Sequence, residues 1–221
     1  MRLNKFLARA SGISRREADD VIASGQVTVN GQAANIGQSI DEQHDAVIYK
    51  GQKLTLPTAD TTIMLNKPVG YVCSRKRQGD SPTIYELLPK DFQKLKTIGR
   101  LDKDSSGLIL LSDNGDLAHQ LTHPKFAKVK EYTVTLDHPL SALHQQMISD
   151  FGISLEDGTS QLILESLNDK RTKFRVTMHE GRNRQIRRTF AALGYQVKTL
   201  HRLSFDNYQL GNLEPGQWKS V

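Results

Sequence analysis

Short apolar stretches bounded by turn residues recur through most of the chain, and they limit the possible folds more than any other feature. They cover residues 63–65, 108–111, 131–136, 162–167, 174–178 and 195–200. Stretches of this length, ended by Gly, Pro, Asn or Asp, are typical of strands. Residues 141–151 and 184–193 instead have the pattern of helices. The order predicts an α+β fold with a large sheet.

The first 58 residues have a separate pattern, two helices followed by short strands. The run SRRE at residues 14–17 has the form of a capping box, in which Ser14 and Glu17 satisfy free N–H groups at the start of a helix. Residues 27–29 and 46–49 alternate as strands, and a Gly-containing turn follows each. Residues 56–62 are typical of a linker. We predict two domains, residues 1–58 and 59–221.

The composition indicates a folded protein that binds a polyanion. Hydrophobic residues make up 37% of the chain, which is enough for a core, and the formal net charge of +6 favours nucleic acid or an anionic membrane. No apolar run approaches the roughly 20 residues of a membrane helix, and the chain starts without an apolar signal segment. We therefore expect a cytoplasmic protein. The single cysteine, Cys73, and the histidine spacing predict neither a disulfide nor a metal site.

Basic residues are concentrated at the N-terminus, where no acidic residue precedes Glu17. The basic residues are Arg2, Lys5, Arg9, Arg15 and Arg16. The first three share one face of the first helix, and the last two lie at the start of the second helix, where free N–H groups favour a phosphate. A solvated helix face is the alternative. With residues 25–31, GQVTVNG, the segment resembles the S4 domain, a small module that binds structured RNA. This resemblance implies phosphate contacts that orient the RNA.

Asp102 is the acidic residue that we single out as a catalytic candidate. It lies between Arg100 and Lys103 in a Gly-bounded loop before the apolar stretch 108–111. Basic neighbours favour an ionised carboxylate, and loops held by a sheet often carry catalytic groups. Taken alone, Asp102 could equally be an ordinary loop carboxylate. A second motif, GRNRQIRR at residues 181–188, is dense in arginine, which pairs well with carboxylates and phosphates.

Four motifs together resemble the bacterial ribosomal small-subunit-type pseudouridine synthases, which join an S4 domain to a catalytic domain. They are LNKP at 65–68, GRLD at 99–102 with SGL at 106–108, KEY at 130–132, and GRNRQIRR at 181–188. The resemblance implies a large mixed, mainly antiparallel sheet flanked by helices. It also implies that Asp102 is the catalytic aspartate, Tyr132 the active-site tyrosine and Arg187 the arginine that pairs with the aspartate. Arg100 matches the basic residue beside the catalytic position.

Pseudouridine formation breaks the N1–C1′ bond of uridine and joins C5 to C1′, so we expect no cofactor. Asp102 could attack the sugar or base, or remove a ribose proton; the sequence leaves these routes open. Tyr132 could stack on the uracil, or simply face the core. The candidates for gripping RNA phosphates in the catalytic domain are Lys67, Arg100, Arg182, Arg184, Arg188 and Arg202. The histidines at 119, 123, 179 and 201 form no nucleophilic triad with an evident Ser, and we interpret them as structural or RNA-facing.

Two other functions share some of these features. A non-catalytic RNA-binding or ribosome-assembly protein would not need Asp102, Tyr132 and Arg187 together. A glycosidase would need two carboxylates that flank a bond, and Asp104 is the only acid close to Asp102. We therefore expect an RNA pseudouridine synthase that acts as a monomer on ribosomal RNA or a ribosome-assembly intermediate, with 16S rRNA favoured over 23S rRNA and no membrane partner.

Overall fold

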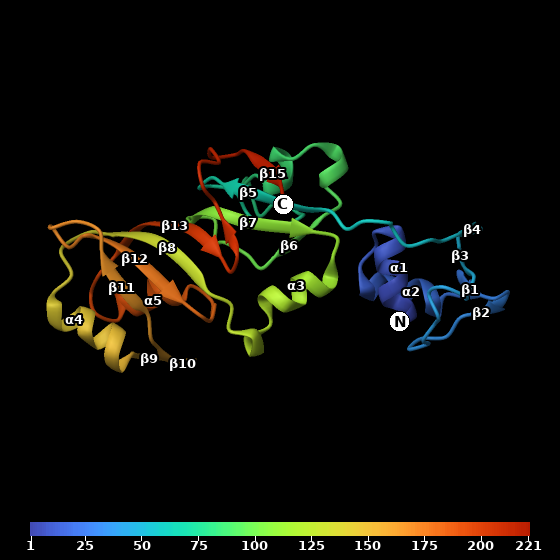
Figure 1. The fold of residues 1–221 in the computed structure, drawn as a ribbon, viewed down its shortest axis with the longest axis horizontal. Helices are drawn as coiled ribbons and strands as arrows, with labels where there is room; N and C mark the ends of the chain where they lie inside the picture. The colour runs from blue at the N-terminus through green and yellow to red at the C-terminus, as the bar shows by residue number, and fades with distance from the viewer. The chain divides into compact units, whose positions relative to one another are not determined.

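The computed structural model describes residues 1–221 and divides them into two compact units, residues 1–61 and residues 62–221 (Figure 1). The division falls inside the stretch 56–62 that the sequence marks as a linker, a few residues beyond the expected boundary at 58/59. No helix is long and apolar enough to cross a membrane. The chain has a mixed α+β architecture, as predicted.

The N-terminal unit packs two helices against a small sheet. Helices α1 (Leu3–Ser11) and α2 (Arg15–Ala23) precede a four-stranded sheet in the order β2-β1-β3-β4. The strands are β1 (Val27–Val29), β2 (Gln32–Ala33), β3 (Val47–Tyr49) and β4 (Gln52–Lys53). The capping box is confirmed: Ser14 Oγ accepts from Glu17 N at 3.1 Å, and Glu17 Oε2 accepts from Ser14 N at 3.4 Å. Apolar side chains of both helices and of the strands form one buried core.

The second unit is built on a nine-stranded sheet. Its path is β11-β12-β8-β13-β7-β5-β15, with β14 paired to β13 and β6 paired to β7. The strands are β5 (Thr62–Lys67), β6 (Lys96–Ile98), β7 (Ser106–Ser112), β8 (Lys130–Leu136), β11 (Ile163–Ser166), β12 (Lys173–Met178), β13 (Val197–Phe205), β14 (Tyr208–Gln209) and β15 (Trp218–Ser220). Only β13 and β7 are parallel. The sheet is therefore mixed and mainly antiparallel.

Helices pack against both faces of this sheet. They are α3 (Gly115–Thr122), α4 (Ala142–Gln146), which continues as a π-helix (Met147–Phe151), and α5 (Gln185–Ala191). Short 3₁₀ helices cover Ile84–Leu87, Lys90–Phe92 and Pro124–Phe126, and a separate hairpin joins β9 (Ile153–Leu155) to β10 (Gly158–Ser160). The helix expected at 184–193 begins one residue later, because Arg184 has a left-handed backbone, with φ of 46°, and is its N-cap; the helix ends at Ala191.

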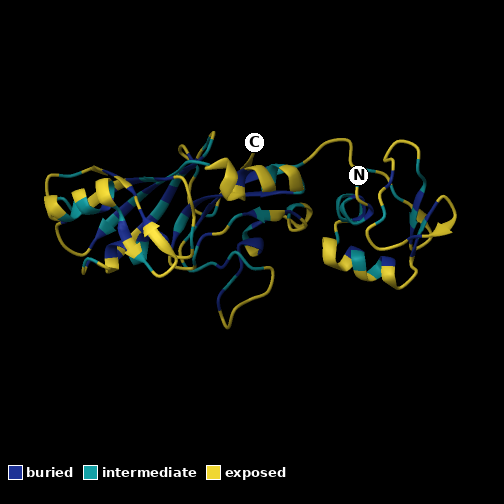
Figure 2. Cartoon of the chain, turned by 90° about the horizontal axis from the view of Figure 1, so that it is seen from below, coloured by how far each residue is buried: buried dark blue, intermediate teal, exposed yellow.

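Strands β5 and β7 are buried on both faces, and this explains their continuous apolar runs. Ile109 and Leu111 of β7 belong to a core that contains α5 residues, whereas Leu108 and Leu110 belong to a second core with Leu121 of α3. In Figure 2 the central strands are dark blue, and exposed residues follow the helices and hairpin tips. Gly107 allows the parallel approach of β7 to β13, because a Cβ there would collide with the Arg202 backbone. This rigid centre carries the loop of residues 99–105.

Candidate active site

A cleft of about 620 Å³ opens where the loop 99–105 meets β8, β13 and the arginine-rich segment. Its lining includes Asp102, Tyr132, Lys130, Arg184 and Arg202, which come from four separate parts of the sequence. The volume lies within the range of small-molecule and cofactor sites. The structure therefore brings Asp102, Tyr132 and part of the arginine-rich motif into one cleft.

Asp102 lies in the loop between β6 and β7. Residues of the segment that follows β5 hold this loop in place through hydrogen bonds. Leu101 O accepts from the Cys73 thiol at 3.3 Å, and Gly70 N donates to Lys103 O at 2.8 Å. Burial raises the pKa of the Cys73 thiol, which lies in a bend after β5 and not in a strand. The Asp102 side chain remains 36% exposed. A carboxylate on a fixed loop that substrate can still reach suits catalysis.

Arg184 is the arginine that pairs with Asp102. Its Nη1 lies 3.5 Å from Asp102 Oδ2, and its two Nη atoms donate to the Asp104 carboxylate at 3.1 and 2.9 Å. These bonds raise the pKa of the Arg184 guanidinium and lower the pKa of Asp104. The left-handed backbone of Arg184 turns its side chain toward the loop instead of along the helix. One guanidinium thus holds both acids of the loop.

The predicted ion pair between Arg187 and Asp102 is wrong. Arg187 Nε lies 3.3 Å from Asp104 Oδ2, Nη2 donates to Asp104 O at 2.8 Å, and Nη1 donates to Val197 O at 2.8 Å. The side chain is only 13% exposed. Burial lowers its pKa, but an arginine stays charged at neutral pH. Arg187 therefore joins the loop of residues 99–105 to β13, one turn along α5 from the arginine that reaches Asp102.

Tyr132 lies on β8 between two neighbouring strands and is 7% exposed. It pairs in register with Val176 of β12 and Arg202 of β13. The ring belongs to the main core and also borders the cleft. The interpretation of Tyr132 as a core residue is confirmed. Stacking on a uracil stays a prediction, and the position of Tyr132 in the cleft lining is compatible with it.

Two cations form part of the cleft lining beside Tyr132. Lys130 Nζ and the Arg202 guanidinium lie 5.1 and 5.2 Å from the centre of the Phe205 ring. Burial, followed by the charge of Arg202, lowers the pKa of Lys130 to about 8. Arg202 Nε donates to Leu108 O at 2.6 Å, and its Nη2 is buried without a partner. The sequence motif KEY included Lys130, but we had not predicted that it belongs to the site.

Two predicted RNA-binding cations are buried, which corrects the prediction for each. Lys67 is fully buried and donates to Ser105 O at 2.6 Å and Pro68 O at 3.0 Å, so it supports the loop that carries Asp102. Burial lowers its pKa. Arg202 is 2% exposed because β13 continues past residue 200 and places it in the sheet. Neither side chain lies on an outer surface that could grip an RNA backbone.

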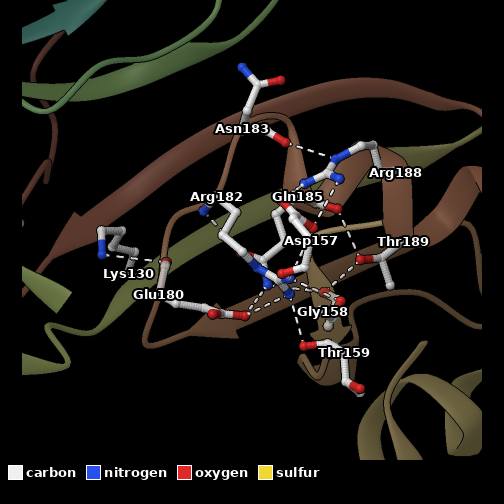
Figure 3. Close-up of polar contacts among 11 residues, drawn as sticks. Lys130, Asp157, Gly158, Thr159, Glu180, Arg182, Asn183, Gln185, Arg188 and Thr189 are labelled. Atoms are coloured by element: carbon white, nitrogen blue, oxygen red, sulfur yellow. Dashed lines mark hydrogen bonds and ion pairs between the residues drawn. The ribbon is translucent and has the colours of Figure 1, made fainter. Parts of the chain in front are cut away.

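Arg182 and Arg188 bind the β9–β10 hairpin, as Figure 3 shows. Arg182 donates to Asp157 Oδ1 at 3.0 Å and to the backbone oxygens of residues 157, 158 and 159. Arg188 pairs with both carboxylate oxygens of Asp157 at 3.0 and 2.6 Å, which lowers the pKa of Asp157. These arginines, predicted to face RNA, mainly hold the hairpin against the segment 180–188. No sequence spacing indicates Asp157, because it lies in a hairpin 25 residues from Arg182 and 31 residues from Arg188.

The remaining basic candidates differ in their exposure to solvent and in their contacts within the protein. Arg100 is exposed and lines the cleft and also a smaller hollow of about 340 Å³. In the N-terminal unit Arg2 donates to Gly37 O, Arg9 pairs with Asp60 at 2.9 Å, and Lys5 is half-buried. Arg15 and Arg16 are exposed, with Arg15 making one long contact to Asn4 at 3.5 Å.

No group of three or more His, Cys, Asp or Glu could hold a metal ion.

Comparisons with known proteins agree along the whole chain. The family model described as RNA pseudouridylate synthase matches residues 61–192, and the S4 domain model matches residues 1–45. The ribosomal small subunit pseudouridine synthase A of Pasteurella multocida is 39% identical, over 100% of this chain and 96% of its own. The protein of the same name from Escherichia coli K12 is 37% identical with the same coverage. A crystal structure of a pseudouridylate synthase superposes with a TM-score of 0.70 at 35% identity, over 100% of this chain and 96% of that one.

Proposed function

Because this chain belongs to the RNA pseudouridylate synthase family and carries an S4 domain, we propose that it converts a specific uridine of small-subunit ribosomal RNA to pseudouridine, with Asp102 as the catalytic carboxylate. The observation that carries this proposal is the cleft in which Asp102, 3.5 Å from Arg184, shares a lining with Tyr132. The names of the relatives support the choice of 16S rRNA. As an enzyme of ribosomal RNA it would act in the cytoplasm.

The reaction is an isomerisation, and the groups in the cleft fit its demands. The N1–C1′ bond breaks, the uracil turns, and C5 bonds to C1′; C5 then loses its proton and N1 gains one. An ionised Asp102 can act as the nucleophile or as the base. Arg184 Nη1 lies 3.5 Å from Asp102 Oδ2, close enough to orient the carboxylate. Tyr132 would stack on the uracil, which must first leave its own stack at a cost of a few kcal/mol.

The division of labour among the arginines follows from their contacts. Arg184 touches Asp102 directly, whereas Arg187 reaches only Asp104 and the backbone of β13. In this proposal Arg187 positions the loop and Arg184 positions the carboxylate. Lys130, which lines the cleft, contributes positive charge there and would attract the phosphate of the target nucleotide, whereas the buried Arg202 stays within the sheet.

The test is Asp102→Asn, which preserves the shape of the side chain and removes its charge. We expect the rate of pseudouridine formation on 16S rRNA to fall by at least about 100-fold, with little change in RNA affinity or in the melting temperature. Asp150→Asn, an exposed carboxylate at the end of the π-helix, is the matched control. A variant with the parent rate would remove Asp102 from the chemistry. Parallel assays on 16S and 23S rRNA test the substrate, and wild-type protein that binds rRNA without modifying it would indicate a non-catalytic assembly protein.

A further inference from the structure

Three aromatic rings gather on the surface where α3 ends and the following turn begins. The ring centres of His119 and His123 are 4.8 Å apart, and the Phe126 ring lies 5.8 Å from His119 and 6.2 Å from His123. The ring pairs are edge-to-face, and Lys125 Nζ lies 4.7 Å from the centre of the Phe126 ring. We call His119, His123, Lys125 and Phe126 the rim cluster. Its four residues are exposed, and none belongs to a buried core.

The backbone of this turn holds the rim cluster in place. His123 Nδ1 accepts from Lys125 N at 3.2 Å, and Phe126 N donates to His123 O at 3.1 Å. Ala127 ends the turn in the left-handed region, at φ of 42°, a conformation that residues with a Cβ rarely adopt. The rings are thus presented to solvent by an ordered 3₁₀ turn. An exposed Phe on a strained turn indicates a functional surface better than a packing role.

The rim cluster is continuous with the cleft that contains Asp102. Thr122, His123 and Pro124 line that cleft, and the chain then enters β8 directly with Lys130 and Tyr132. Arg100 lines the same cleft and is exposed. A nucleic-acid strand whose target base enters the cleft would therefore pass aromatic rings and cations at this edge.

We infer that the rim cluster is a stacking site for an unpaired nucleotide adjacent to the target uridine. This inference rests on the proposed function, because it takes the substrate to be RNA with its reacting base in the cleft. Aromatic side chains bind unpaired bases by stacking, and nearby cations hold the phosphates. Stacking tolerates any base, so this site would select an unpaired neighbour and not a particular sequence. Two histidines without a third ligand do not form a metal site.

The test compares Phe126→Ala with Phe151→Ala in the full-length enzyme. Phe151 is the matched control, since it is 74% exposed, more than Phe126 at 38%, and lies on the π-helix. Neither phenylalanine lines the cleft, but Phe126 is in ring contact with His123, which does. With 16S rRNA as substrate, we expect Phe126→Ala to raise KM by about 5- to 100-fold and to leave kcat within about twofold. Phe126→Trp, which keeps a stacking surface, should retain the parent KM.

Two further measurements separate stacking from charge and from folding. Lys125→Ala should make the dependence of RNA affinity on salt less steep by about one unit of log–log slope, whereas Phe126→Ala should leave this slope unchanged. Affinity for a fully paired RNA duplex should be the same for Phe126→Ala and wild type. The inference fails if Phe126→Ala behaves like Phe151→Ala, or if it weakens duplex binding equally. The two proposals fail in different ways. If wild-type protein modifies no ribosomal RNA, the proposed function is wrong. If wild-type protein is active but Phe126→Ala has the same KM, only the stacking site is wrong.

Discussion

Asp102 and Asp104 are two residues apart, yet the structure gives them different surroundings. Asp104 accepts close bonds from Arg184 and also pairs with Arg187, and these contacts lower its pKa. Asp102 has one longer contact, at 3.5 Å, and stays accessible from the cleft. Asp104 is 46% exposed, but it is held by two arginines and does not line the cleft, whereas Asp102 lines the cleft with only one long contact and can still meet a substrate there. This difference supports the choice of Asp102 as the reacting group.

Arg187 should matter for stability as well as for activity. Arg187→Gln removes the charged contact with Asp104 and leaves Val197 O and Asp104 O without donors in a half-buried site. We expect the free energy of unfolding to fall by about 2–4 kcal/mol and kcat to fall with it, as measured by urea denaturation and single-turnover assays. Arg175→Gln, which breaks an exposed pair with Glu165, is the control and should cost less than about 1 kcal/mol. Equal effects in the two variants would exclude this role for Arg187.

Lys130 should make RNA binding depend on pH near 8. Burial and Arg202 lower its pKa to about 8, although Asp206 and Glu180 oppose the shift, so the free enzyme loses this positive charge as the pH rises from 7 to 9. We expect the affinity for 16S rRNA to fall by up to about 10-fold over that range. Lys130→Arg keeps its charge and should flatten the profile, and Lys130→Met should be weak at every pH. A wild-type profile that matches Lys130→Arg would contradict the prediction.

The same pKa also predicts how stability changes with pH. The folded protein releases the Lys130 proton near pH 8, whereas an unfolded lysine keeps its proton to about pH 10.4. The unfolded state therefore binds more protons between these values, and this residue makes the free energy of unfolding rise with pH there. Thermal melts at pH 7.5 and 9.5 measure this effect. Between these two pH values, the melting temperature of wild type should rise relative to that of Lys130→Met.

At the scale of elements, the β9–β10 hairpin is held to the cleft wall mainly by polar contacts. Arg182 and Arg188 both reach Asp157, and Gln185 and Thr189 of α5 both contact Ser160 of β10. Arg182 and Gln185 also line the cleft. The position of the hairpin is thus coupled to the wall that faces Asp102.

Asp157→Ala tests that coupling. Loss of its carboxylate leaves Arg188 bound only to Asn183 O, and it leaves Arg182 bound to the hairpin through backbone oxygens alone, with Glu180 as its remaining carboxylate partner. We expect faster amide hydrogen exchange at residues 158–160 and 182–185, a nearly unchanged melting temperature, and a kcat lower by about 10-fold because the cleft wall is less well positioned. Glu165→Ala removes a similar exposed carboxylate–arginine pair away from the cleft and should change none of these. Unchanged exchange in Asp157→Ala would show that the Asp157 carboxylate does not fix the hairpin and would contradict the prediction.

Elements defined by local interactions were predictable, and contacts between distant residues were not. The Ser14–Glu17 capping box and the alternation of β8 depend on neighbouring residues, and both are confirmed. The partner of Arg187 depends on whether the loop 99–105 turns Asp102 or Asp104 toward it. The sequence motifs do not indicate which of the two carboxylates it meets. Lys67 is buried because Ser105, 38 residues away, supplies a carbonyl oxygen. Basic side chains that complete the internal structure have the same sequence signature as those that bind RNA.

At the scale of the whole molecule, this distinction redistributes the positive charge. Much of the arginine-rich segment is committed to Asp104, Asp157 and backbone oxygens, and Lys67 and Arg202 are buried. Few cations of residues 62–221 that the sequence proposed for RNA contacts remain free, and Arg100 is the clearest. We therefore expect the exposed Arg15 and Arg16 of the N-terminal unit to contribute more to RNA affinity. The net charge of +6 therefore does not show by itself how many cations are available to RNA, because many arginines are paired with carboxylates or backbone oxygens inside the protein.

Deleting residues 1–61 should separate affinity from chemistry. Each unit has its own buried core, so residues 62–221 should stay folded. We expect the truncated enzyme to bind 16S rRNA more weakly, with a log–log salt dependence less steep by about 2 if Arg15 and Arg16 each neutralise one phosphate. Its kcat at saturating RNA should stay within a few-fold of wild type, because the cleft is intact. The double variant Arg15→Ala/Arg16→Ala of the 221-residue chain should show the same change in slope. If both proteins bind RNA as tightly as wild type, residues 62–221 alone recognise the RNA.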